Sequence, residues 1–103
     1  PDTSQAMQQW GFTMGTQTCL HAILETNIAV TETDFRSELP RVTVPTLILH
    51  GTEDVSCPLA MTSERTVTLI PGARLEVVEG ASHGLILTHA ERVNAELLKW
   101  CRT

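Results

Sequence analysis

Residues 46–49 read Thr-Leu-Ile-Leu, a short apolar run that ends shortly afterwards at Gly51. Its apolar side chains are consecutive and do not alternate with polar ones, which is typical of a strand covered on both faces, as in a parallel sheet. Pro45 has no N–H group to donate to a strand ladder, so the strand is predicted to begin at Thr46. This run therefore predicts a sheet with helices packed on both of its faces.

A second strand is predicted at residues 75–78, where Gly80 follows. Between the two strands, Pro58 suits the first turn of a helix, and the helix is expected to stop at Pro71. A strand, a helix and a further strand in this order predict a right-handed β-α-β unit. The residues that support the intervening helix are its apolar members, Leu59, Met61, Val67, Leu69 and Ile70.

The C-terminal residues 88–101 predict a helix with an apolar face. Thr88 and Glu91 have the T-x-x-E spacing of a capping box, in which each side chain satisfies a free backbone amide of the first turn. Near the other end of the chain, apolar residues at helical spacing predict a core-facing helix over residues 17–29. Residues 4–10 predict only weak helical turns, interrupted by Gly11 and Gly15.

Two parallel strands do not make a complete sheet. Both of their outer edges lack partners, and helices on either face have little surface to cover. We therefore expect further strands from a longer parent chain or from a partner. Pro1 stands where an initiator methionine would be, and no signal peptide follows it, so the chain is expected to begin within a longer protein.

Composition excludes several classes of partner. With 12 acidic and 7 basic residues the net charge is -5, and no run of Lys or Arg could neutralise a nucleic-acid backbone. No apolar segment approaches the roughly 20 residues of a membrane span. The cysteines are an odd number at wide spacings, which fits neither a disulfide framework nor a zinc motif, so a reduced cytoplasmic setting is expected. They are Cys19, Cys57 and Cys101.

An acid and a histidine follow the two predicted strands. Asp54 comes after the first strand and His83 after the second, and the carboxyl ends of parallel strands meet at one edge of a sheet. A carboxylate bonded to an imidazole makes a general-base unit. The alternative is two ordinary loop residues, and position alone does not decide between them. Glu53 is the less favoured acid, because its side chain should diverge from that of its neighbour.

The remaining candidates have simpler interpretations. His50, at the end of the first strand, is predicted to be a structural hydrogen-bond donor. Trp10 and Met14 lie in the glycine-interrupted segment and could belong to the core or line an apolar substrate pocket. The histidines are scattered without the spacing of metal ligands, so neither a metal site nor a cofactor is predicted.

Several motifs together resemble a known superfamily. The P-T-L-x-x-H-G-x-x-D pattern of residues 45–54 and the Ser-His-Gly of residues 82–84 are similar to the C-terminal part of the α/β-hydrolase fold. Residues 33–36 and 88–94 resemble its cofactor-free haloperoxidase and esterase branch. The resemblance implies that residues 33–103 form the C-terminal β-α-β-α part of the core and residues 1–32 the end of a helical cap.

The resemblance also implies roles for individual residues. Asp54 would be the acid and His83 the base of a catalytic triad, in the superfamily's order of Ser, Asp, His. Trp10 and Met14, in the cap, would contact substrate. The chain departs from the superfamily in one respect, because it contains no G-x-S-x-G motif. The serines that it does have stand in no such turn, so the nucleophile is expected elsewhere. They include Ser56, Ser63 and Ser82.

The resulting hypothesis is the C-terminal segment of a serine hydrolase that cleaves a small ester through an acyl-enzyme. Its expected partner is the N-terminal part of the same fold, and the segment alone is expected to be inactive. Two alternatives remain. One is a binding or assembly module that docks through an exposed sheet edge. The other is cofactor-independent lyase or oxygenase chemistry on the same fold.

Overall fold

The structure is a computed structural model that describes residues 3–102. The chain divides between Phe35 and Arg36 into two compact units. The first contains two helices, and the second contains a parallel two-stranded sheet with the remaining helices. The predicted boundary between a cap segment and a core segment, after residue 32, stays a prediction.

The first unit begins with α1, Gln5–Thr16. The Ser4 hydroxyl caps it by accepting a hydrogen bond from the Met7 amide at 3.2 Å. The helix continues through Gly11 and Gly15, so the prediction that these glycines interrupt it is wrong. Each glycine costs only about 1 kcal/mol relative to alanine in a helix, and the cap together with five good helix formers at residues 5–9 offsets that cost.

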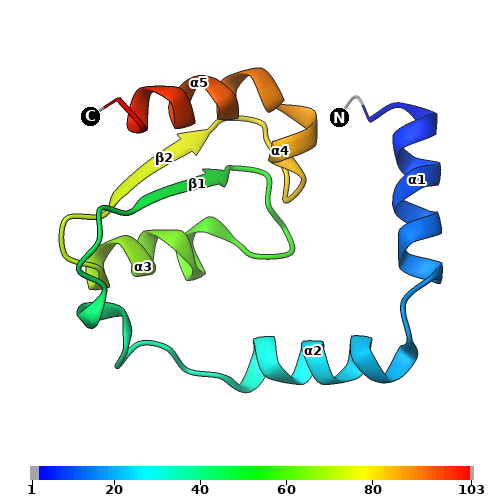
Figure 1. Ribbon diagram of the computed structural model, residues 1–103, viewed down its shortest axis with the longest axis horizontal. Coiled ribbons are helices and arrows are strands. Elements are labelled where there is room, and N and C mark those ends of the chain that lie inside the picture. Colours follow the sequence, from blue (N-terminus) through cyan, green and yellow to red (C-terminus); the bar gives the residue numbers. More distant parts are fainter. Residues whose placement is uncertain (1–2, 103) are drawn as a thin grey trace. The chain divides into compact units, whose positions relative to one another are not determined.

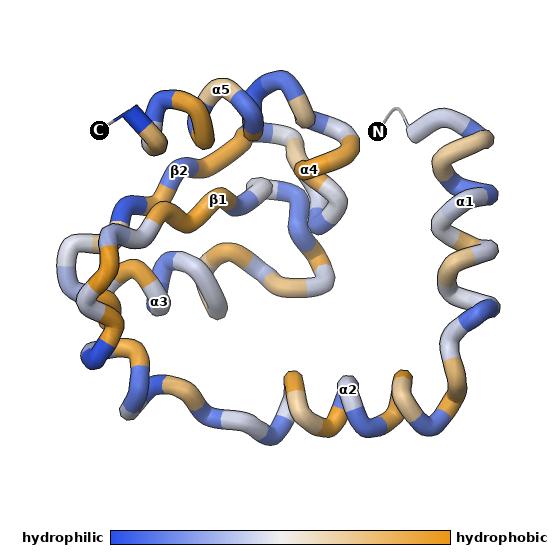
Figure 2. Tube along the Cα trace, viewed as in Figure 1, coloured by the Kyte–Doolittle hydropathy of each residue, from blue (hydrophilic) through white to orange (hydrophobic). Residues whose placement is uncertain are grey.

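The second helix of this unit is α2, Leu20–Glu32. It begins later than the predicted residue 17, because α1 extends to Thr16 and residues 17–19 form the link. No buried residue occurs in α1 or α2, all of whose residues the structure describes. Apolar and polar residues alternate along α2 (Figure 2), and the apolar stripe that was predicted to face a core is exposed in this chain. Its exposed members include Leu20, Ile23, Leu24 and Ile28.

The second unit has the predicted α/β order, with two strands that pair in parallel. Leu47 lies opposite Arg74 and Gly51 opposite Val78. Helices α3 and α5 lie on opposite sides of the two strands (Figure 1). The elements are η1 Leu39–Arg41, β1 Leu47–Gly51, η2 Leu59–Met61, α3 Ser63–Leu69, β2 Arg74–Val78, α4 Leu85–Thr88 and α5 Ala90–Trp100.

Two helices differ from the sequence prediction. The helix after Pro58 is divided into η2 and α3, because Thr62 leaves helical geometry with φ -122° and ψ -89°. The predicted capping box is wrong, since α4 already includes Thr88 and no side chain caps α5. The Thr88 hydroxyl instead approaches the Gly84 carbonyl oxygen at 3.3 Å, the bond to the preceding turn that threonine commonly makes inside a helix.

A small core joins β2 to the two last helices. Val78 and Val93 are 5% and 4% exposed, and Ala81 is fully buried beside them. Leu85 completes the buried cluster, and the partly buried Leu49 of β1 packs against it. Because Val78 is the last residue of β2 and Ala81 belongs to the loop after it, this core fixes the position of that loop.

Backbone contacts join these two loops. The Thr52 amide donates to the Val78 carbonyl at 3.1 Å, and the Glu53 amide donates to the Ala81 carbonyl at 2.9 Å. In return the Gly80 amide donates to the Thr52 hydroxyl at 2.9 Å. The backbone of Gly51 lies so close to that of Ala81 that a Cβ atom at residue 51 would overlap the Ala81 carbonyl group. The absence of a side chain at residue 51 therefore permits the approach that brings the two loops together.

Gly51→Ala should destabilise the protein that carries this chain. The added methyl group has only backbone to displace, and overpacking of this kind costs about 1–3 kcal/mol or more. Urea unfolding should show a clearly lower midpoint. Gly84→Ala is the matched control, because a Cβ atom there meets nothing within 4 Å. Equal midpoints for the two variants would contradict the tight contact.

Candidate functional site

Asp54 is held in the loop after β1 by the loop's own backbone. Its Oδ1 atom accepts hydrogen bonds from the Ser56 amide at 3.0 Å and from the Cys57 amide at 2.9 Å. Aspartate commonly closes a turn in this way. The side chain is only 4% exposed, so its carboxylate is fixed and largely shielded from solvent.

These contacts lower the pKa of Asp54 below its ordinary value. The hydrogen bond from the Cys57 amide is the largest cause, while burial acts in the opposite direction. The hydrogen bond and charge of His83 and the Ser56 amide lower the pKa further. Donors aimed at a carboxylate favour its charged form, so Asp54 is ionised at neutral pH.

His83, in the loop after β2, meets the second oxygen of the same carboxylate. Its Nδ1 atom lies 2.8 Å from Asp54 Oδ2. A carboxylate can only accept a hydrogen bond, so Nδ1 carries the N–H hydrogen and is the donor. In the neutral imidazole this leaves Nε2 with a free electron pair, and the His83 side chain is 65% exposed. The pair therefore presents an oriented base, as a general-base unit requires.

A second histidine, His50, lies close to Asp54. His50 is buried, and its Nε2 atom lies 2.8 Å from the Cys57 carbonyl oxygen, which can only accept. His50 is therefore a hydrogen-bond donor at this position, as the sequence predicted. Its Nδ1 atom lies 2.7 Å from the Ser63 hydroxyl at the start of α3. His50 Nε2 and Asp54 Oδ2 are 3.5 Å apart.

The predicted meeting of Asp54 and His83 is confirmed, but the sequence did not predict the contacts of Ser63 and of the Cys57 peptide. One feature of the sequence pointed to such contacts: a histidine at the end of a buried strand needs a hydrogen-bond partner for each ring nitrogen. The sequence did not show which residues those partners are. Glu53, the rejected alternative to Asp54, has an exposed side chain, whereas Asp54 is buried.

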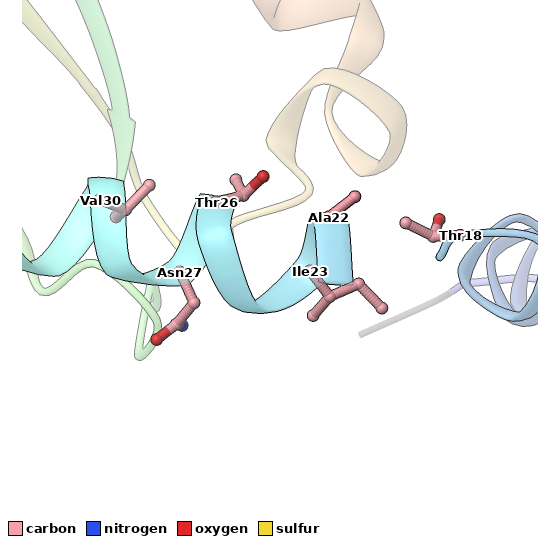
Figure 3. Close-up of a pocket in the computed structure, with 6 residues that line it drawn as sticks. All are labelled: Thr18, Ala22, Ile23, Thr26, Asn27 and Val30. Atoms are coloured by element: carbon pink, nitrogen blue, oxygen red, sulfur yellow. The ribbon is translucent and has the colours of Figure 1, made fainter. Parts of the chain in front are cut away.

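Trp10 and Met14 lie on α1 in the other unit, where they are 57% and 50% exposed. Their assignment to a substrate pocket stays a prediction. A shallow groove in this unit follows α2, where Ala22 and Val30 project from one side of the helix and Asn27 from the other (Figure 3). Neither Trp10 nor Met14 lines it. Its lining residues are Thr18, Ala22, Ile23, Thr26, Asn27 and Val30.

Residues 3–102 lack two further features. No group of three or more His, Cys, Asp or Glu side chains in that range is arranged to hold a metal ion. None of the helices in the same range has the length and apolar character needed to cross a membrane.

Comparison with known proteins gives consistent relatives. No protein-family model matches the chain. The chain is 41% identical over 99 residues to a non-heme haloperoxidase from Rhodococcus erythropolis, which covers 96% of this chain and 36% of the relative.

Two solved structures have the same arrangement of elements. An esterase from Exiguobacterium antarcticum matches with a TM-score of 0.92 and 32% identity, over 100% of this chain and 38% of its own. A bromoperoxidase from Bacillus anthracis matches with a TM-score of 0.94 and 29% identity, over 98% of this chain and 37% of its own. The chain thus spans a little over a third of the length of these relatives. It forms the C-terminal part of an α/β-hydrolase fold and resembles the non-heme haloperoxidase and esterase branch of that superfamily.

Proposed function

We propose that this chain supplies the acid, Asp54, and the base, His83, of a serine hydrolase that acts on small esters. The observation that carries the proposal is the 2.8 Å bond between His83 Nδ1 and Asp54 Oδ2 at the carboxyl ends of two parallel strands. That edge of a parallel sheet is where reactive groups gather. The similarity to an esterase of known structure supports the same reaction class.

In this mechanism His83 Nε2 takes the proton of a serine hydroxyl as the serine oxygen attacks the ester carbonyl. Asp54 stabilises the imidazolium that forms and keeps Nδ1 protonated. The alcohol leaves with the proton from His83, and the acyl group remains on the serine. His83 then takes a proton from a water molecule as the water oxygen attacks the acyl carbonyl, and it returns that proton to the serine oxygen as the acid leaves.

The serine nucleophile is assigned to a segment outside residues 1–103. Ser63, the buried serine of the second unit, bonds to His50 and not to the proposed base. The partner of this chain is therefore the N-terminal part of the same fold, which would supply the serine, the oxyanion-binding amides and the further strands. The chain's limited share of its relatives' length supports this division.

A second candidate reaction follows from two of the relatives, which are a haloperoxidase and a bromoperoxidase. Hydrogen peroxide could replace water in the second step. Its oxygen would attack the acyl carbonyl while His83 takes the proton, and His83 would return that proton to the serine oxygen as the peracid leaves. The same acid and base serve both reactions. The two reactions differ only in whether water or hydrogen peroxide attacks the acyl-enzyme.

Asp54→Asn in the protein that carries this chain should lower kcat for p-nitrophenyl acetate by on the order of 10³–10⁴-fold, because the imidazole loses its tautomer and its counter-charge. KM should change little. Glu53→Gln is the matched control, since it removes an exposed neighbouring carboxylate and should leave turnover unchanged. Near-wild-type turnover of Asp54→Asn would refute the assignment of the acid.

A fluorophosphonate probe should label one serine outside residues 1–103, as peptide mass mapping would show. Labelling should be lost in His83→Ala, because the serine is then no longer deprotonated. A label on Ser56, Ser63 or Ser82 would contradict the assignment of the nucleophile. Absence of both labelling and ester hydrolysis would favour the binding-module alternative.

The lowered pKa of Asp54 also predicts a pH dependence of stability. The unfolded chain has the ordinary value of 3.8, so below about pH 4 it binds more protons than the folded protein. The stabilisation due to Asp54 is complete above this range and is lost as pH falls. The Asp54→Asn variant lacks this stabilisation at every pH. The difference in urea midpoint between wild type and variant should therefore become smaller as the pH is lowered from 5 to 2.5. A constant gap would disprove this linkage.

A further inference from the structure

We propose that His50 is a positioning residue for the acid Asp54 and acts on it through the backbone of Cys57. The inference rests on the function proposed above for Asp54 and His83. His50 touches neither substrate nor base in this scheme. Its role is to hold the residue whose amide fixes the carboxylate.

The first step of the argument is the anchoring of the imidazole ring. His50 belongs to β1, and its Nδ1 atom lies 2.7 Å from the hydroxyl of Ser63 at the start of α3. Both residues are 8% exposed. Since one end of this contact is in a strand and the other in a helix, the ring has a fixed orientation.

The second step is the bond from that ring to the loop. His50 Nε2 donates to the Cys57 carbonyl oxygen at 2.8 Å, across seven residues of chain. The Cys57 amide in turn donates to Asp54 Oδ1 at 2.9 Å. The backbone of residue 57 is thus held at its carbonyl by His50 while its amide holds the acid.

The direct contact between His50 and Asp54 is weaker than the connection through the backbone of Cys57. The distance of 3.5 Å from His50 Nε2 to Asp54 Oδ2 is long for a hydrogen bond, and Oδ2 already accepts from His83 at 2.8 Å. The Cys57 amide is also the largest cause of the lowered pKa of Asp54. Loss of the His50 bond should therefore release the loop and misplace the carboxylate, without removing a group that reacts.

Two substitutions of His50 separate its two bonds. In His50→Gln the side-chain amide nitrogen stands as many bonds from Cα as imidazole Nε2 does, so the donor to the Cys57 carbonyl is retained. In His50→Asn the shorter amide keeps a polar group near Nδ1 and loses that donor. We expect kcat for p-nitrophenyl acetate to fall at least tenfold in His50→Asn with KM unchanged, and to stay within about threefold of wild type in His50→Gln.

A double-mutant cycle shows whether His50 acts through Asp54. In the Asp54→Asn background, His50→Asn should cause no further loss of kcat, because the carboxylate that it positions is already gone. The same tenfold loss in both backgrounds would overturn the proposal. Equal losses in His50→Gln and His50→Asn would overturn it as well.

The low-field proton resonance of His83 Nδ1 gives a readout that does not need activity. It should persist in wild type and His50→Gln and should broaden or move in His50→Asn. Ser63→Ala, which frees the imidazole ring, should have a smaller effect of the same kind and serves if His50→Asn does not fold. An unchanged resonance in all variants would refute the positioning role. A wild-type protein that shows the resonance but no ester hydrolysis would refute the proposed function alone.

Discussion

The rest of the structure depends on the close contact between the loop after β1 and the loop after β2. Gly51 has no side chain, so the Ala81 carbonyl can lie against it, and the Thr52 and Glu53 amides can then bond to the second loop. Asp54 follows immediately in one loop and His83 in the other. Their 2.8 Å bond is therefore a consequence of backbone contacts that involve neither side chain.

Around this contact, the buried polar side chains of the site have partners of fitting chemistry. One carboxylate oxygen of Asp54 bonds to loop amides and the other to His83. His50 connects the strand to the far end of the same loop. No buried side-chain nitrogen or oxygen lacks a hydrogen bond within the described part of the chain. A carboxylate with so many donors stays charged, which suits the role of triad acid proposed for Asp54.

The second unit has an ordered polar site but a very small apolar core. Four residues form its buried cluster, whereas Leu47, Ile48 and Leu49 of β1 are only half-buried. Consecutive apolar residues in a strand normally lie between two covering layers, and here two helices cover a sheet of two strands. The sequence of β1 therefore fits a wider sheet, in agreement with the chain's limited share of its relatives' length.

The sequence by itself determined the α/β order, the parallel pairing and the placement of Asp54 and His83 after successive strands, because hydrophobic runs and glycine stops are local patterns. The helix limits predicted from the sequence were wrong at Gly11, Thr62 and Thr88. Weak local preferences compete at these residues, so small energy differences decide where a helix begins or ends. The partners of His50 and the contact of Gly51 with Ala81 were decided only by the tertiary structure. These contacts join residues from 7 to 30 positions apart in the chain, and nothing in the local sequence encodes which residues will meet.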